Sequence, residues 1–245
     1  MMWDELPKPN VISLKYRKDR HEEVKNESSK IGLNVNMHYV DKHPKGGEQG
    51  CFESHVQLCK MSLEAGHKHA FILEDDFEVT GDFLNQNSKC IDALLEAIEF
   101  MKNKKWKLFY LGVLPNWWTS NSKRVGKLIY QLQPWACTHS YLIHESYMKE
   151  VSEWKYTGTP IDKMYRNCDL AFAIQPQIFK QRNSPSDINH FITPCPDFLR
   201  DVPVNFSGWY SLNIGISGMN LFFMVLIFMG LTKVSKKELL LSGNN

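Results

Sequence analysis

The chain has 245 residues, which is long enough to bury a sizeable core in one large or two small domains, and we favour one. Its 29 basic and 27 acidic side chains are interspersed and leave a net charge of +2, so it lacks the basic field that nucleic-acid binding requires. The 6 cysteines form no C-x-x-C motif, which argues against a zinc site. We expect buried free thiols, or disulfides if the domain faces an oxidising lumen.

The first predicted elements alternate between strand and helix. Residues 11–14 form a short apolar and β-branched run, which predicts the first strand, and residues 35–40 predict the second. Between them, residues 19–30 are mostly polar and compatible with a helix that ends near Gly32. Strand, helix and strand in this order are typical of the opening of an α/β fold.

A basic cluster that contains Arg17 and Arg20 follows the first predicted strand. Two interpretations of this cluster stay open. It is either the solvated start of a helix with Asp19 as the N-cap, or a cradle for an anion. The second interpretation rests on the planar guanidinium fork of arginine, which suits phosphate.

The next helix is predicted over residues 49–66, where apolar side chains recur at helical spacing and a glycine ends the segment. Near the start of this helix, Ser54 and His55 are candidates to face a ligand. The alternative is a structural role, because a single histidine near a helix start is more often part of the core.

An acidic triplet of Glu74, Asp75 and Asp76 ends a third predicted strand over residues 69–73. Three adjacent carboxylates repel one another unless a cation or a set of donors neutralises them. Hard oxygen ligands favour Mg²⁺ or Mn²⁺, and the open coordination positions of these ions commonly hold phosphates. The triplet therefore predicts a metal site at the sheet edge, with a solvated acidic turn as the alternative.

The α/β pattern continues in the second half of the domain. We predict helices over residues 90–101 and 145–154, strands over residues 106–111, 128–133 and 139–143, and a broken strand or loop over residues 170–179, where a proline interrupts an apolar run. A loop over residues 157–162 is predicted to present the carboxylate of Asp162.

The C-terminal part of the sequence is apolar. No side chain between residues 202 and 232 is charged, and about 20 apolar residues cross a bilayer as a helix. We therefore predict a transmembrane helix over residues 212–232, with a buried core helix as the alternative. A linker over residues 191–211 precedes it, and a short basic tail over residues 233–245 follows it.

Two observations about membrane orientation oppose each other. The lysines after the predicted span favour a cytosolic tail and hence a lumenal domain. The N-terminal residues do not resemble a cleavable signal peptide, which favours insertion after synthesis with the domain left in the cytosol. The sequence predicts a single-pass membrane protein and leaves the side of the membrane open.

Several of these segments together look like glycosyltransferase family 25, which contains lipopolysaccharide and procollagen galactosyltransferases. The resemblance covers roughly residues 9–190, which we take as the transferase domain (residues 1–190), and the segments occur in the family's order. They are Arg17 and Arg20, residues 50–55, residues 73–76, residues 139–143, residues 160–162, residues 175–176, Gln181 and residues 184–186. Each segment is short, but their combined match in order is specific.

The resemblance implies a GT-A-like α/β domain with a mixed central sheet flanked by helices. It also implies a nucleotide-sugar donor, expected to be a UDP-sugar, and a divalent cation, Mn²⁺ or Mg²⁺. In such an enzyme Asp76 would bind the metal that bridges the two phosphates, and Asp75 would support the metal or bind it. Inverting transfer needs a general base, and Asp162 is the candidate. The other substrate contacts implied are Arg17, Arg20, Ser54, His55, Glu74, Gln181 and Ser184.

The leading hypothesis is a metal-dependent, membrane-anchored enzyme that moves galactose or glucose from a UDP-sugar to a glycan or to a hydroxylated protein side chain. One alternative is a transferase fold without turnover that binds a sugar or a nucleotide at a membrane surface. Another is a metal-dependent phosphoester hydrolase, which would explain the carboxylates but not the ordered family segments.

Overall fold

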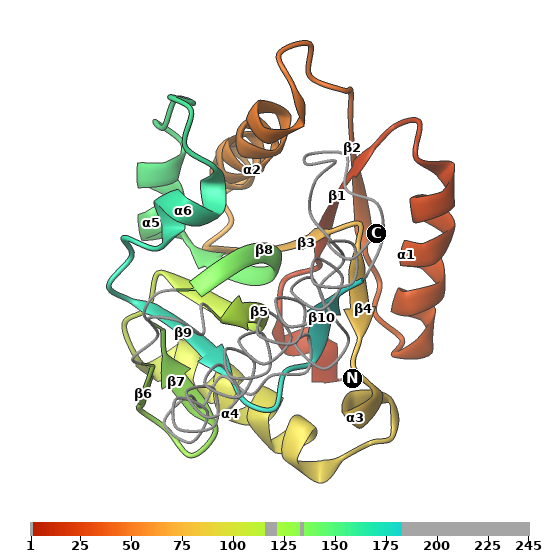
Figure 1. Cartoon of the computed structure of the whole chain (residues 1–245). Coiled ribbons are helices and arrows are strands. Elements are labelled where there is room, and N and C mark those ends of the chain that lie inside the picture. Colours follow the sequence, from red (N-terminus) through yellow and green to blue (C-terminus); the bar gives the residue numbers. More distant parts are fainter. Residues whose placement is uncertain (1, 116–121, 133–134, 183–245) are drawn as a thin grey trace, which may run out of the picture. The chain divides into compact units, whose positions relative to one another are not determined.

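The computed structural model describes residues 2–115, 122–132 and 135–182, which belong to one compact unit spanning residues 1–205 (Figure 1). The elements of the described residues are η1 (Met2–Glu5), β1 (Asn10–Leu14), α1 (Lys18–Lys30), β2 (Asn36–Val40), α2 (Gly47–Glu64), β3 (His69–Glu74), β4 (Phe77–Val79), α3 (Gly81–Leu84), α4 (Ser88–Asn103), β5 (Leu108–Pro115), β6 (Lys123–Arg124), β7 (Ile129–Gln131), β8 (Trp135–His144), α5 (Glu145–Val151), α6 (Ile161–Tyr165), β9 (Ala171–Ile174) and β10 (Phe179–Gln181).

Within the described residues, a mixed sheet of 8 strands has the order β2-β1-β3-β8-β5-β9-β7-β6. The strands β2, β1 and β3 run parallel, whereas β8 is antiparallel to both β3 and β5. A separate antiparallel pair joins β10 to β4. The predicted α/β class with a mixed sheet is therefore confirmed.

Helices cover both faces of the sheet. Successive residues of a strand point to opposite faces, so one strand contributes to the core on each side. In β3, Phe71 and Leu73 belong to one core cluster, and Ala70 and Ile72 belong to another. The first cluster includes buried residues of α1, α3 and α4, and the second includes buried residues of α2, α5 and α6 (Figure 1). This two-sided burial explains why β3 is a continuous apolar run rather than an alternating one.

Most of the predicted helices and strands are confirmed, with differences at their ends. The interpretation of Asp19 as an N-cap is wrong: α1 begins at Lys18, Arg17 occupies the cap position, and Asp19 lies in the first turn. Its carboxylate there accepts hydrogen bonds from the Arg17 guanidinium. The helix predicted to end at residue 154 ends at Val151.

One segment predicted as a loop contains a helix, and the segment predicted as a broken strand or a loop is a broken strand. Asp162 lies in the first turn of the short helix α6, not in a loop. The apolar run around Pro176 forms two strands in different sheets, β9 beside β5 and β10 beside β4. Pro176 interrupts the run as predicted, but tertiary pairing that is invisible in the local sequence gives each half its own partner.

The close packing of β10 against β5 gives a testable result at Gly112. A Cβ atom at this position would overlap the carbonyl oxygen of Phe179 and lie 2.7 Å from Nε2 of His139. Since backbone cannot move aside cheaply, we expect Gly112→Ala to lower the free energy of unfolding by about 3 kcal/mol in urea denaturation. The matched control is Gly81→Ala, where a Cβ meets nothing within 4 Å. Equal stability of the two variants would contradict this packing.

The predicted linker, transmembrane helix and basic tail lie outside the described residues and stay predictions. Within the described ranges, no helix combines the length and apolarity needed to cross a membrane. The five cysteines of these ranges, Cys51, Cys59, Cys90, Cys137 and Cys168, have free thiols.

Candidate active site

A pocket opens beyond the carboxyl ends of β1 and β3, where ligand sites of α/β proteins commonly lie. Its wall includes the end of β1, the loop after β2, the first half of α2 and the acidic triplet. The two strands are parallel neighbours in which Ile12 lies opposite Glu74, so the residues that follow each of them meet at this edge. The sheet thereby joins a basic helix start and an acidic strand end that are far apart in sequence.

Asp75 is held by the first strand and the first helix. Its Oδ2 accepts a hydrogen bond of 2.7 Å from the Ser13 hydroxyl, and its Oδ1 lies 2.6 Å from Nη1 of Arg20. Burial raises the pKa of the Asp75 carboxyl, although Arg20 and Ser13 oppose this effect. Both oxygens already accept hydrogen bonds, so the metal role predicted for Asp75 is less well supported by the geometry than the one predicted for Asp76.

Within the described ranges, Asp76 keeps one carboxylate oxygen without a hydrogen-bond partner. Its Oδ2 accepts a 2.9 Å hydrogen bond from Nε2 of Gln181 and lies 3.7 Å from Nη1 of Arg20. Its Oδ1 is buried and accepts no hydrogen bond from any residue that the structure describes. Burial, followed by the charge of Glu74, raises the pKa of Asp76 to about 7. A buried carboxylate with an unused oxygen is a group that a cation would stabilise.

Glu74 faces α2 and β8. Its Oε1 accepts a hydrogen bond from the Thr138 hydroxyl and lies 3.4 Å from Nε2 of His55. Burial alone would raise the pKa of Glu74, but His55, Thr138 and His139 together hold it below its ordinary value. Carboxyls of the triplet therefore differ in their electrostatic environment: the pKa of Glu74 is lowered, whereas that of Asp76 is raised.

Cys51 and Asp162 share the electrostatic environment of the triplet. Burial, and then the charges of Glu74, Asp162 and Asp76, raise the pKa of the Cys51 thiol. Asp162 lies in the first turn of α6 and does not belong to the wall of the pocket. Nη2 of Arg166 lies 3.4 Å from Asp162 Oδ2, and the backbone N–H of Lys163 donates to Oδ1.

The structure brings most of the predicted site residues together. His55 and Ser54 line the pocket with Arg20 and the triplet, although the Ser54 hydroxyl donates to the carbonyl of Gly50 within its own helix. Gln181 reaches the site through Asp76.

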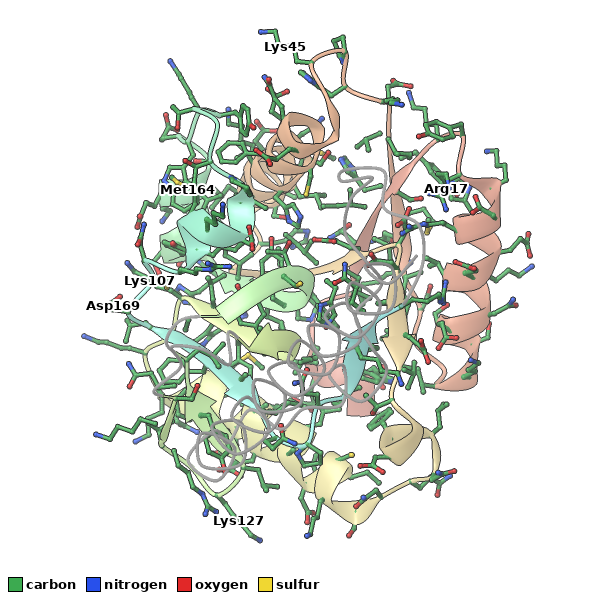
Figure 2. All side chains as sticks on the ribbon, in the orientation of Figure 1. Arg17, Lys45, Lys107, Lys127, Met164 and Asp169 are labelled. Atoms are coloured by element: carbon green, nitrogen blue, oxygen red, sulfur yellow. The ribbon has the colours of Figure 1, made fainter. Side chains whose placement is uncertain are left out.

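Arg17, Asp162 and Ser184 are the exceptions, and Asp162 is not part of the pocket wall. Arg17 is not part of the pocket wall and pairs with Asp19 at the start of α1, where Figure 2 shows it. Ser184 lies outside the described residues.

Sequence reasoning missed three contributors: Ser13, Thr138 and Cys51. For Cys51 a signal existed, because positions four apart on a helix share a face and His55 follows at that spacing. No local signal identifies Ser13 or Thr138. They reach the triplet only because β1 and β8 both pair with β3.

A mixed α/β sheet with an acidic, arginine-containing pocket at the ends of its parallel strands defines a class of ligand-binding α/β domain. The family model for glycosyltransferase family 25 (LPS biosynthesis protein) matches residues 36–165, which is more than half of the chain. The chain therefore belongs to glycosyltransferase family 25, as its motifs predicted, and this membership supports a glycosyltransferase-like function. A search of curated proteins found no significant match.

Several solved structures share part of the fold at low sequence identity. The crystal structure of A197 from STIV has a TM-score of 0.44 and 10% identity, with coverage of 76% of this chain and 96% of that one. A glycosyltransferase involved in glycosylation of the major capsid of PBCV-1 has a TM-score of 0.34 and 14% identity, with coverage of 65% and 74%. The inositol-1-phosphate CTP transferase from T. maritima has a TM-score of 0.40 and 12% identity, with coverage of 74% and 73%. Likenesses this distant carry no functional assignment.

Proposed function

We propose that the protein is a metal-dependent hexosyltransferase that moves galactose or glucose from a UDP-sugar to a glycan or a hydroxylated protein side chain. The observation that carries the proposal is the buried Oδ1 of Asp76, which has no hydrogen-bond partner in the described part of the chain and lies in a pocket that also contains Arg20 and Glu74. Family membership supports the reaction class, and the acidic triplet and Arg20 in one pocket support the binding of a cation and of an anionic donor.

The residues present fit a divalent cation of the Mg²⁺ or Mn²⁺ type. Asp76 would hold it, with Asp75 in support through Arg20, since carboxylate oxygens are the ligands that these ions prefer. When bound, such an ion would stabilise the negative charge that develops on a departing nucleoside diphosphate.

The chain's own residues orient the donor in this proposal. Arg20 is buried, and its pairing with Asp75 fixes the guanidinium at the pocket edge, where it is suited to a phosphate oxygen. Gln181 holds the Asp76 carboxylate in place through a single hydrogen bond. Fixed dipoles and charges of this kind stabilise a transition state without reorganising during the reaction.

Asp162 is the proposed general base that takes the proton from the acceptor hydroxyl. A contact to a sugar hydroxyl is its competing role. We expect Asp162→Asn to lower kcat by about 10² to 10⁴-fold with little change in KM for the donor, because proton transfer contributes about this much. A steady-state assay with Asp92→Asn as the control, an exposed position on α4, measures the effect. A higher KM at unchanged kcat would assign Asp162 to binding instead.

Thermal unfolding of the full-length protein tests the donor and the metal together. We expect one nucleotide sugar, a UDP-sugar, to raise Tm by about 3 °C or more at saturation in the presence of Mn²⁺ and to have little effect with a chelator. A binding protein without turnover would show the same shift but release no transferred sugar. A hydrolase would release free phosphate without a glycosylated product. The absence of a shift with every nucleotide sugar, in a folded sample, would refute the proposal.

A further inference from the structure

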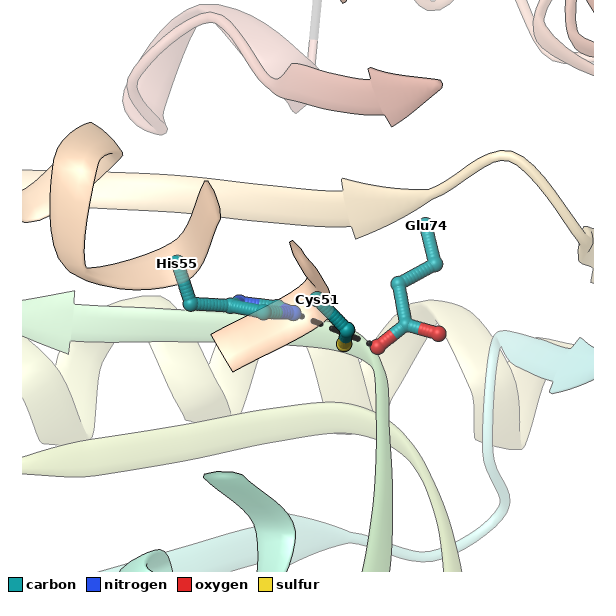
Figure 3. Close-up of side chains that lie close together, drawn as sticks. All are labelled: Cys51, His55 and Glu74. Atoms are coloured by element: carbon teal, nitrogen blue, oxygen red, sulfur yellow. Dashed lines mark ion pairs between the residues drawn. The ribbon is translucent and has the colours of Figure 1, made fainter. Parts of the chain in front are cut away.

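The pocket contains a second group of metal-ligand atoms, distinct from the Asp75 and Asp76 carboxylates. The thiol of Cys51, a ring nitrogen of His55 and a carboxylate oxygen of Glu74 all lie within 4.8 Å of one another. Figure 3 shows the imidazole of His55 and the carboxylate of Glu74 pointing toward each other, with the Cys51 thiol beside the line that joins them. Cys51 and His55 are four residues apart on α2, and Glu74 ends β3.

His55 presents an unsatisfied nitrogen to this group. The side chain is fully buried, and its Nε2 has no close hydrogen-bond partner among the described residues: Glu74 Oε1 lies 3.4 Å away, which is long for a hydrogen bond. Buried polar atoms without a partner are rare in folded proteins because each costs free energy. A cation between the imidazole, the thiol and the carboxylate would give Nε2 the partner that it lacks.

The other nitrogen of His55 is held as in a metal-binding histidine. Nδ1 lies 2.7 Å from the Tyr141 hydroxyl, which lies 3.1 Å from the hydroxyl of Tyr165, and both tyrosines are fully buried. With the ring proton on Nδ1 and donated to Tyr141, Nε2 carries the lone pair that faces Cys51 and Glu74. Glu74 is oriented in the same way, because Thr138 donates a hydrogen bond to its carboxylate.

We propose that Cys51, His55 and Glu74 bind a borderline transition-metal ion of the Zn²⁺ type. Sulfur, nitrogen and oxygen donors suit Zn²⁺, whereas the oxygen-only ligand at Asp76 suits Mg²⁺ or Mn²⁺. Three protein ligands leave a fourth coordination position, and all three residues line the same pocket as Asp76. Coordination of the thiolate releases the thiol proton to solvent. The inference rests on the fold and not on the proposed transfer reaction.

The sequence contains no local zinc motif for a physical reason. Such motifs consist of paired cysteines and histidines close together in sequence. Here two ligands come from one helix face and the third comes from the end of a strand, so only the packing of α2 against β3 brings them together.

Cobalt absorption tests the proposal, because Co²⁺ replaces Zn²⁺ and shows a charge-transfer band when a thiolate is bound. We expect the full-length protein, freed of metal by chelation, to bind one Co²⁺ with this band and to lose the band on addition of Zn²⁺. Cys51→Ala should abolish the band. The matched control is Cys59→Ala, which removes a buried thiol two turns further along α2 and should keep it. A wild-type protein without the band, or a band that survives in Cys51→Ala, would overturn the proposal.

Two further variants keep the test decisive if Cys51→Ala fails to fold. His55→Gln should weaken Co²⁺ binding at least about tenfold, and Tyr141→Phe should weaken it about 10 to 100-fold while the band persists, as loss of a supporting hydrogen bond does. Asp76→Asn should leave the band unchanged although it removes the proposed Mn²⁺ ligand. Unchanged affinity in His55→Gln would contradict the site, whereas loss of transfer activity in Asp76→Asn alone would concern only the proposed function.

Discussion

Asp76→Asn is expected to lower the rate of sugar transfer by at least about 10³-fold while the protein stays folded. The substitution keeps the shape of the side chain and an acceptor for Gln181, but it removes the negative charge that a divalent cation needs. A transfer assay with Mn²⁺, combined with the unfolding curve of the same sample, measures both effects. Asp82→Asn, at an exposed position on the neighbouring α3, is the matched control and should retain full activity.

The same variant is expected to be more stable than the wild type at high pH when metal is absent. The pKa of Asp76 rises from its ordinary value of 3.8 to about 7, so the fold favours the protonated acid. Burial of the Asp76 carboxyl therefore lowers the free energy of unfolding little below pH 4. The loss grows as the pH rises towards 7 and reaches its full size above pH 7. This rise in pKa corresponds to a loss of roughly 4 kcal/mol in the free energy of unfolding, and partial solvent access to the side chain reduces the loss to roughly 2 to 3 kcal/mol.

Urea denaturation at pH 4 and pH 8 in a chelator separates this effect from other titrations. The stability difference between Asp76→Asn and the wild type should be near zero at pH 4 and reach its full size at pH 8. Retained transfer activity in a folded Asp76→Asn sample would refute the metal role of this residue. A stability difference independent of pH would refute the raised pKa.

The sequence predicts the local structure around the site well because the signals there are local. The apolar run of β3 ends in carboxylates, and α1 follows β1 with a basic start, so the edge of an α/β sheet was the expected place for Glu74, Asp75 and Asp76. The family segments added the reaction class, which the family match confirms. The position of the triplet and the family could both be predicted from short segments of sequence, because neither prediction requires the strand order.

The partners of the carboxylates depend on strand order, which no local pattern encodes. Ser13 reaches Asp75 because β1 lies beside β3, and Thr138 reaches Glu74 because β8 inserts between β3 and β5. Gln181 reaches Asp76 from β10, a strand that forms only by pairing with β4. The sequence therefore predicted that the carboxylates need neutralisation. The fold decides that both oxygens of Asp75 accept hydrogen bonds, whereas Oδ1 of Asp76 has no partner among the described residues.

Arg20→Met is expected to lower the free energy of unfolding by about 3 to 5 kcal/mol. Methionine keeps much of the apolar stem but removes the guanidinium that lies 2.6 Å from Asp75 and 3.7 Å from Asp76. Removal of one partner from a buried ion pair leaves the other charge without compensation, which is more costly than loss of the pair. Urea denaturation at neutral pH measures the change.

A second substitution separates this charge effect from lost packing. Asp75→Asn in the Arg20→Met background removes the uncompensated charge and keeps an oxygen that accepts from Ser13, so it should restore at least about 2 kcal/mol. Arg17→Met is the matched control: it breaks the ion pair with Asp19, which is 60% exposed, and should cost less than about 1 kcal/mol. If the double variant were no more stable than Arg20→Met, the arginine would act through packing. The burial of the three adjacent carboxylates would then not depend on the ion pair between Arg20 and Asp75.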